Sequence, residues 1–317
     1  MSFSSTAKNE LSRIIPEDKC CQLAEISGFI RMCGTIKLSG KGRMNIKLVT
    51  ENAAAARKII KLLKLYFDIH TDLIISQNKM LKKHYYYELV ITSEMKAEEI
   101  LRKTGILVEK DGLQNIDYSV PEMLIKKKCC KRAYLRGAFL GSGSVTDPGK
   151  AYHLEIVTNN SQLAEDIKDL LNKFKLNAKI VMRKKNFVIY LKEGEQIVDF
   201  LNIVGAHKTL LDLENIRIVK EMRNKVNRLV NCETANLNKI VDTAVRQMSD
   251  IQYIEAQRGL GILPDKLREV AELRLENSGV SLQELGEMLV PPIGKSGVNH
   301  RMKKIEEIAE KIRQGKI

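Results

Sequence analysis

The chain has 317 residues, of which 44% are hydrophobic, so it is long and apolar enough to form two or three domains with separate cores. It carries 53 lysines and arginines against 39 aspartates and glutamates, and the formal charge of +14 predicts a polyanionic partner. The first 15 residues lack the apolar stretch of a signal peptide and no apolar run can span a bilayer, so we expect a cytoplasmic protein and no membrane partner. The 5% aromatic content argues against a surface that stacks single-stranded bases.

A glycine-centred segment occurs twice in the first two thirds of the chain. The sequence ISGFIRMCG at 26–34 recurs as LRGAFLGSG at 135–143, and LVTEN at 48–52 recurs as IVTNN at 156–160. Repetition at a nearly constant offset indicates two copies of one folding unit. The predicted limits of the two repeats are residues 1–115 and 116–211.

Each repeat has the pattern of an initial helix, a strand hairpin, a second helix, another hairpin and a last helix. Alternating or β-branched residues mark the strands, and apolar residues at helical spacing mark the helices. The order αββαββα, present twice, predicts an α+β fold. The second helices are expected at 53–67 and 161–173, and the clearest strands at 46–50, 85–92, 153–157 and 186–191.

A helical connector is expected over residues 212–262. Its apolar residues recur at helical spacing, which predicts one face packed against another part of the protein. Its arginines and lysines lie on the other faces, where they either contact phosphates or are simply solvated. Gly259, Gly261 and Pro264 end the helix. The apolar face comprises Ile216, Val219, Met222, Val226, Leu229 and Val230.

Residues 263–317 are predicted to form three helices. The first covers 265–276. The second begins at Ser281, which forms a capping box with Glu284, and the third is capped by Ser296. Three short helices in this order are typical of a helix-turn-helix domain.

The third of these helices has an apolar stripe on one side and polar and basic residues on the other. Such a helix docks by its apolar side and presents its N-terminal residues to a major groove. Asn299 suits pairing with adenine, while Arg301 or Lys303 suits guanine or phosphate. His300 is expected to face the groove or solvent, and a basic three-helix bundle without a DNA role is the alternative. The predicted DNA-binding residues are Lys295, Ser296, Asn299, His300, Arg301, Lys303 and Lys304, with Ser281 and Gln283 at the start of the second helix.

The duplicated αββαββα order with a glycine-rich first helix resembles the LAGLIDADG homing-endonuclease fold. The resemblance implies that small residues let two helix backbones approach at a pseudo-two-fold axis. In active nucleases of this fold, the eighth residue of each motif is an acid that holds divalent metal beside DNA. Those positions are Cys33 and Ser142 here, so we expect no nuclease activity, no metal and no cofactor. The predicted interface glycines are Gly28, Gly34, Gly137 and Gly143.

Two vicinal cysteine pairs, Cys20-Cys21 and Cys129-Cys130, occupy matching positions in the two repeats. The chain has no CxxC pair and no histidine at ligand spacing from a cysteine. This spacing favours small, buried, reduced cysteines over zinc ligands or disulfides.

A degenerate LAGLIDADG-like pair followed by a helix-turn-helix, with NRLVNCETAN at 227–236 and GKSGVNHR at 294–301, resembles the WhiA family. The resemblance implies a bacterial DNA-binding regulator linked to cell division, chromosome segregation and, in sporulating lineages, sporulation. In some members a WhiB-type partner acts jointly. We therefore predict a nucleoid-associated protein that binds double-stranded DNA sequence-selectively and regulates transcription.

Other functions compete with this prediction. The chain is alternatively a metal-dependent homing endonuclease or an RNA maturase, with metal held by backbone or unconventional ligands. It is alternatively a scaffold in which the duplicated domain binds a protein and the C-terminal helices assist. A duplication unrelated to the LAGLIDADG fold is the alternative at the level of structure.

Overall fold

The computed structural model describes residues 2–39, 43–77 and 85–316. The chain forms two compact units, the first ending at Lys220 and the second beginning at Glu221, and each has its own hydrophobic core. Helix α8 (His207–Arg258) begins in the first unit and ends in the second. Among the described helices, none has the length and apolar character needed to cross a bilayer.

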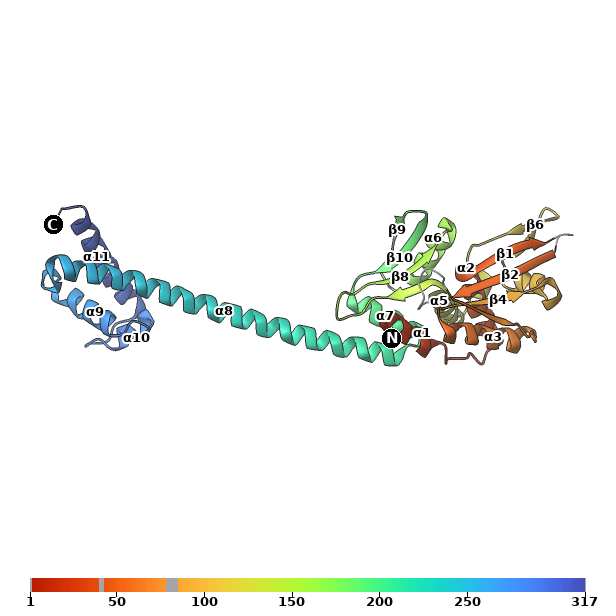
Figure 1. The fold of residues 1–317 in the computed structure, drawn as a ribbon, viewed down its shortest axis with the longest axis horizontal. Helices are drawn as coiled ribbons and strands as arrows, with labels where there is room; N and C mark the ends of the chain where they lie inside the picture. The colour runs from red at the N-terminus through yellow and green to blue at the C-terminus, as the bar shows by residue number, and fades with distance from the viewer. Residues whose placement is uncertain (1, 40–42, 78–84, 317) are drawn as a thin grey trace. The chain divides into compact units, whose positions relative to one another are not determined.

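The first unit contains the predicted duplication, and each repeat has its own four-stranded antiparallel sheet (Figure 1). The strand orders are β1-β2-β4-β3 and β7-β8-β10-β9, so both repeats have the same topology. The duplicated α+β fold is therefore confirmed. The first repeat contains α2 (Lys19–Cys33), β1 (Gly34–Ser39), β2 (Arg43–Thr50), α3 (Ala53–Phe67), β3 (Leu73–Gln77), β4 (Tyr85–Ile91) and α4 (Ala97–Lys103). The second contains α5 (Lys128–Ser142), β7 (Gly143–Val145), β8 (Leu154–Thr158), α6 (Ser161–Asn172), β9 (Lys179–Arg183), β10 (Asn186–Leu191) and α7 (Gly194–Val204).

Helix α1 and strands β5 and β6 of the first unit lie outside the repeated pattern. Helix α1 (Phe3–Leu11) precedes the first repeat and contacts α3 and α5. Strands β5 (Leu107–Lys110) and β6 (Leu113–Ile116) form a separate hairpin after α4. The sequence pattern did not predict them, because none of the three has a counterpart in the second repeat.

The repeated sequence LVTEN/IVTNN recurs because its last asparagine begins the second helix of each repeat. The side-chain oxygen of Asn52 accepts from the Ala55 amide at 2.8 Å, and that of Asn160 accepts from the Leu163 amide at 2.8 Å. Each satisfies a helix amide that otherwise has no partner, which is the usual role of an N-cap asparagine. The two caps fix where α3 and α6 begin.

Helices α2 and α5 pack against each other at glycines. A Cβ atom on Gly28 would lie 2.4 Å from the Tyr134 carbonyl oxygen, and one on Gly137 would lie 2.1 Å from the Glu25 carbonyl oxygen. No residue with a side chain fits either position without separating the helices, so these two glycines permit the close backbone approach. Gly141, which we did not predict, is also at this interface, since its Cβ would lie 2.8 Å from Met32 Cβ.

Gly34 and Gly143 differ from the expectation that they line the helix interface. A Cβ on Gly34 would lie 2.3 Å from the Ile30 carbonyl oxygen, and one on Gly143 would lie 2.2 Å from the Phe139 ring. Both clashes are with the helix that the glycine itself ends. These glycines therefore let each helix pass directly into the following strand, with no intervening loop.

The expectation that the apolar face of the connector packs against something is wrong for most of that face. In α8 the side chains of Val219, Met222, Val226, Leu229 and Val230 are all exposed. Ile216, nearer the start of α8, is half-buried. Helical spacing alone predicted an apolar stripe, but burial depends on a neighbour that only the tertiary structure supplies.

The second unit is built from the end of α8 and three further helices around one core. Ile251 and Ile254 of α8 are fully buried in it. Its helices are α9 (Asp265–Glu276), α10 (Leu282–Glu287) and α11 (Lys295–Arg313), preceded by the 3-10 turn η4 (Leu260–Ile262).

Candidate nucleic-acid interface

Helix α11 is docked on the second unit by one buried stripe. The residues Val298, Met302, Ile305, Ala309 and Ile312 recur every three or four positions and are all buried. Because the helix turns by about 100° per residue, the opposite face is left to solvent. This geometry agrees with the apolar stripe predicted from the sequence.

The segment between α10 and α11 is longer than a tight turn, yet it folds back on α10. The Ile293 amide donates to the Gly286 carbonyl at 3.0 Å. A Cβ atom on Gly286 would lie 2.2 Å from the Ile293 carbonyl oxygen, so glycine is needed at this position. The close approach keeps α10 and α11 adjacent despite the longer connection.

The capping box predicted at the start of α10 is present. Ser281 Oγ accepts from the Glu284 amide at 3.3 Å, and a Glu284 carboxylate oxygen accepts from the Ser281 amide at 2.7 Å. The backbone and side-chain hydrogen bonds from Ser281 lower the pKa of Glu284. The cap expected at Ser296 is wrong: α11 begins at Lys295, with Gly294 as its N-cap, and has no side-chain cap. The extended backbone of Gly294 already starts the helix before Ser296 is reached.

Arg274 holds the turn between α9 and α10, a role that the sequence analysis missed. Its side chain is almost completely buried, and its Nη1 donates to the Val280 carbonyl at 2.8 Å. Burial lowers the pKa of this guanidinium. A single arginine in an otherwise ordinary amphipathic helix gives no sequence signal of such a role, since most arginines at such positions are exposed.

Most of the predicted DNA-binding residues are exposed, but one of them, Arg301, contacts another helix. Arg301 is half-buried and its Nη1 donates to the Lys266 carbonyl of α9 at 3.4 Å, so it lies against α9. Gln283 of α10 is exposed and contacts Glu287. The remaining predicted α11 residues are exposed: Ser296, Asn299, His300, Lys303 and Lys304 lie away from the buried stripe, and Lys295 lies at its flank.

The end of α8 adds polar residues to this face. Asn299 and Lys303 line a groove together with Thr243, Arg246 and Gln247 of α8. The α8 residues were not predicted as part of the site, because they are about 50 residues away in the sequence. Their helical pattern by itself indicates only a connector.

The positions equivalent to nuclease acids lie at the ends of α2 and α5. The Cys33 thiol donates to the Phe29 carbonyl at 3.3 Å, and burial raises its pKa to about 12. The Ser142 hydroxyl is buried with no hydrogen-bond partner among the described residues. Neither group is an anionic oxygen ligand of the kind that magnesium-type ions require.

A lysine from the N-terminal helix lies beside these positions. Lys8 of α1 interacts electrostatically with Cys33 and Glu51, and it lines a surface cavity together with Glu51 and Ser142. Burial lowers the Lys8 pKa to about 8, and the two neighbours oppose that shift. An ammonium group at this place repels a divalent cation.

Family profiles match most of the chain in three segments. The WhiA N-terminal LAGLIDADG-like domain matches residues 19–107, the WhiA LAGLIDADG-like domain matches 131–223, and the WhiA C-terminal HTH domain matches 226–309. The chain belongs to the WhiA family. This WhiA chain therefore carries both LAGLIDADG-like repeats and the helix-turn-helix domain.

Relatives of this WhiA chain are similar along its whole length. "Probable cell division protein WhiA" of Alkaliphilus metalliredigens is 57% identical over 313 residues, which cover 99% of each chain. The protein of the same name from Clostridium beijerinckii is 54% identical over 316 residues, which cover 100% of both. The crystal structure of full-length DUF199/WhiA from Thermotoga maritima matches with a TM-score of 0.61 and 28% identity, covering 98% of this chain and 99% of that one.

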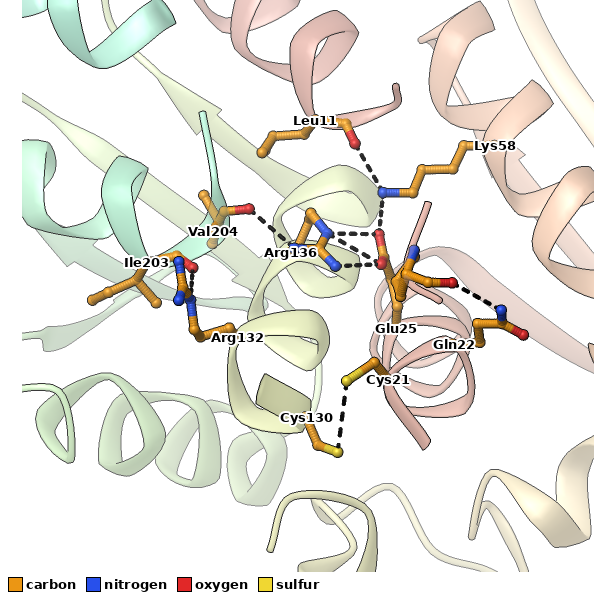
Figure 2. Close-up of polar contacts among 11 residues, drawn as sticks. Leu11, Cys21, Gln22, Glu25, Lys58, Cys130, Arg132, Arg136, Ile203 and Val204 are labelled. Carbon is orange, nitrogen blue, oxygen red and sulfur yellow. Dashed lines mark hydrogen bonds and ion pairs between the residues drawn. The ribbon is translucent and has the colours of Figure 1, made fainter. Parts of the chain in front are cut away.

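A buried ion network joins the two LAGLIDADG-like repeats of this WhiA chain, as Figure 2 shows. The Glu25 carboxylate of α2 pairs with Lys58 of α3 and with Arg136 of α5. Lys58 also donates to the Leu11 carbonyl of α1 at 2.8 Å, and Arg136 donates to the Val204 carbonyl at 3.2 Å. Burial lowers the pKa of Lys58 to about 8, although Glu25 opposes the shift. One acid thus ties together α1, α2, α3, α5 and the end of α7.

The vicinal cysteines are only partly as expected in this WhiA chain. Cys21 and Cys130 are buried, but Cys20 and Cys129 are exposed. The two pairs meet, because the Cys21 and Cys130 sulfur atoms are 3.9 Å apart. The spacing in the sequence gave no sign of this meeting, since the pairs belong to different repeats.

Proposed function

We propose that this WhiA chain is a sequence-selective double-stranded DNA-binding protein that regulates transcription in connection with cell division and chromosome segregation, and with sporulation where the lineage sporulates. One observation carries the proposal: the N-terminal half of α11 exposes six polar or basic side chains while its apolar stripe is buried in a helix-turn-helix core. A docked helix with polar residues near its N-terminus is what major-groove readout requires. The helix-turn-helix family match and the name shared by its relatives support the proposal.

We assign base readout and phosphate binding to different side chains. The Asn299 amide has both a donor and an acceptor, which suits two hydrogen bonds to adenine. Lys295, Lys303 and Lys304 supply phosphate contacts and therefore salt-dependent affinity. Arg301 already contacts Lys266, so its role in this proposal is to hold α11 at its angle. We assign DNA binding to the helix-turn-helix domain over residues 263–317. Arg246 and Gln247 of the connector over residues 212–262 extend this surface, because they line the same groove as Asn299.

The LAGLIDADG-like domain acts in this proposal as a platform without nuclease activity. Cys33 and Ser142 lack carboxylates and Lys8 adds a positive charge beside them, which supports this role. The domain over residues 1–211 then contacts DNA backbone or a protein, including a WhiB-type partner in lineages that have one. The proposed location is the nucleoid.

Site selection followed by point substitution tests the DNA proposal. The full chain selects a site from a random duplex library, and binding to that site and to a scrambled duplex is measured by fluorescence anisotropy. Asn299→Ala and His300→Ala are expected to reduce discrimination between the two duplexes by about 1–3 kcal/mol each. Gln314→Ala, an exposed amide at the other end of α11, serves as control. Full discrimination in both variants would exclude α11 as the recognition helix.

Incubation with DNA and divalent cations tests the absence of nuclease activity. The full chain is mixed with a plasmid library and Mg²⁺ or Mn²⁺, and the DNA is examined for nicks and breaks. Intact plasmid is the expected result. Cleavage that disappears when Cys33 and Ser142 are substituted would instead establish an enzyme with unconventional metal ligands.

A further inference from the structure

Four cysteines from the two repeats meet at the first turns of α2 and α5. Cys20 and Cys21 are the second and third residues of α2, and Cys129 and Cys130 are the second and third residues of α5. Close packing of α2 on α5 at Gly28 and Gly137 brings these turns together. In Figure 2 the Cys21 and Cys130 side chains point toward each other across the two helices.

The sulfur atoms are spaced as metal ligands are. Ligand atoms of Cys20, Cys21 and Cys130 all lie within 4.8 Å of one another, and so do those of Asp18, Cys21 and Cys129. The Cys21 and Cys130 sulfurs are 3.9 Å apart, and those of Cys129 and Cys130 are 4.0 Å apart. Four thiolates around a zinc ion at 2.3 Å form a tetrahedron with edges of about 3.8 Å. These two separations match the edges of a tetrahedral thiolate site, and both are well above the length of a disulfide bond.

The surroundings favour thiolates once a cation is bound. All four cysteines lie in the first turns of helices, where the amides and the helix dipole stabilise negative charge. Lys127, Lys128 and Lys131 are close to Cys129 and Cys130 in the sequence, and the Asp18 carboxylate lies within 4.8 Å of the Cys21 and Cys129 sulfurs. Metal binding releases the protons of the cysteine thiols to solvent.

We propose that Cys20, Cys21, Cys129 and Cys130 bind one zinc ion across the pseudo-two-fold axis of the LAGLIDADG-like pair. Thiolate sets of this kind select soft or borderline ions such as zinc over magnesium. Each repeat supplies two ligands, so the ion joins the start of α2 to the start of α5. The site lies at the opposite ends of these helices from Cys33 and Ser142, so it is a structural site and separate from the degenerate nuclease positions.

Metal binding by the full chain tests the site directly. The protein is reduced, stripped with a chelator and titrated with zinc against a chromophoric competitor, and bound metal is counted by mass spectrometry. The expected result is about one zinc per chain, and cobalt in its place should give the intense visible bands of tetrahedral thiolate coordination. Zinc is also expected to raise the melting temperature, because it binds only the folded arrangement.

Two double variants and one control identify the ligands. The double variant Cys21→Ser/Cys130→Ser removes the buried pair of thiols. The double variant Cys20→Ser/Cys129→Ser removes the exposed pair and leaves the hydrophobic core unchanged, so it tests zinc binding even if the first variant does not fold. Both are expected to lose tight zinc binding and the zinc-dependent rise in melting temperature. Cys232→Ser, at an exposed cysteine of α8, should keep both.

Three results would overturn the proposal. In the first, the reduced wild-type chain takes up no stoichiometric zinc. In the second, both double variants bind zinc as the wild type does. In the third, the protein purified without reductant contains a disulfide between the pairs and, after reduction, binds no metal, which would indicate a redox pair in place of a metal site.

Discussion

Arg136 of α5 donates three hydrogen bonds of 2.9–3.1 Å to the buried carboxylate of Glu25 on α2. Tyr134 occupies the position in the second repeat that Glu25 occupies in the first. The interface between the repeats is thus asymmetric in charge although its backbone is duplicated. The pair also orients Lys58, the second cation bound to Glu25.

Glu25→Gln is expected to destabilise the first unit by about 3–5 kcal/mol, because it leaves Lys58 and Arg136 as buried cations without a counter-ion. Urea unfolding followed by circular dichroism measures the change. Glu98→Gln is the control, since Glu98 forms an exposed pair with Arg102 and should cost less than about 1 kcal/mol. Equal losses in the two variants would contradict a structural role for the buried network.

Gly137→Ala is expected to cost about 1–3 kcal/mol or more, because its Cβ would lie 2.1 Å from the Glu25 carbonyl oxygen and must push α2 and α5 apart. The matched change is Gly194→Ala at the start of α7, where the nearest atom would be at an ordinary 3.5 Å. Thermal unfolding of both variants distinguishes the two sites. If Gly137→Ala were as stable as Gly194→Ala, close helix approach would not depend on this glycine.

Lys8→Met is expected to stabilise the protein at neutral pH and to lose this advantage at alkaline pH. Burial lowers the Lys8 pKa from 10.5 to about 8, so the unfolded chain holds the proton more tightly than the folded one. Below about pH 8 Lys8 is protonated in both the folded and the unfolded state. Burial of its ammonium group then lowers the folding stability by on the order of 1 kcal/mol, after allowance for partial exposure. That cost disappears between about pH 8 and 10.5.

Urea unfolding of Lys8→Met and wild type at a series of pH values checks this dependence. The difference in unfolding free energy should shrink as the pH rises through that window. Lys311→Met, at an exposed lysine of α11, should change stability by less than about 0.5 kcal/mol. A Lys8→Met advantage that stayed constant or grew with pH would refute a buried ammonium at this place.

Ser281→Ala is expected to lower the stability of the second unit by about 1 kcal/mol, because it removes the hydroxyl that accepts from the Glu284 amide. Ser278→Ala, at an exposed serine in the preceding turn, is the control. Hydrogen exchange of the α10 amides reports the loss locally. Protection that is unchanged in Ser281→Ala would show that the capping box contributes nothing.

Lys304→Ala is expected to weaken binding to the selected and scrambled duplexes equally and to reduce the slope of affinity against salt by about 1. Lys311→Ala removes the same charge from the far end of α11, about 10 Å along the helix axis, and should change both affinities less. Anisotropy titrations at several salt concentrations give the slopes. A loss confined to the selected duplex would reassign Lys304 from phosphate binding to base readout.

Local patterns predicted much of the architecture. The αββαββα order, the start of α3 at Asn52 and the capping box at Ser281 all follow from residues a few positions apart, so the sequence contains the whole signal. The apolar stripe of α11 was predictable for the same reason. Its exposed face followed from helix geometry alone.

Other features depend on residues that are distant in the sequence. Helical spacing did not reveal that Val226 and Leu229 of α8 are exposed, or that Arg246 and Gln247 share a groove with Asn299. Burial and grooves are properties of two surfaces in contact, and a periodic pattern describes only one of them.

The sequence by itself determined that the chain is a duplication without the nuclease carboxylates, followed by a helix-turn-helix, because these follow from residue types and short-range spacing. Only the tertiary structure decided what the duplication places together. Packing of α2 on α5 brings Glu25 to Arg136 and Cys21 to Cys130, more than 100 residues apart in the chain. Those pairings depend on how closely two helix backbones approach, and that distance is set by side chains on both helices at once.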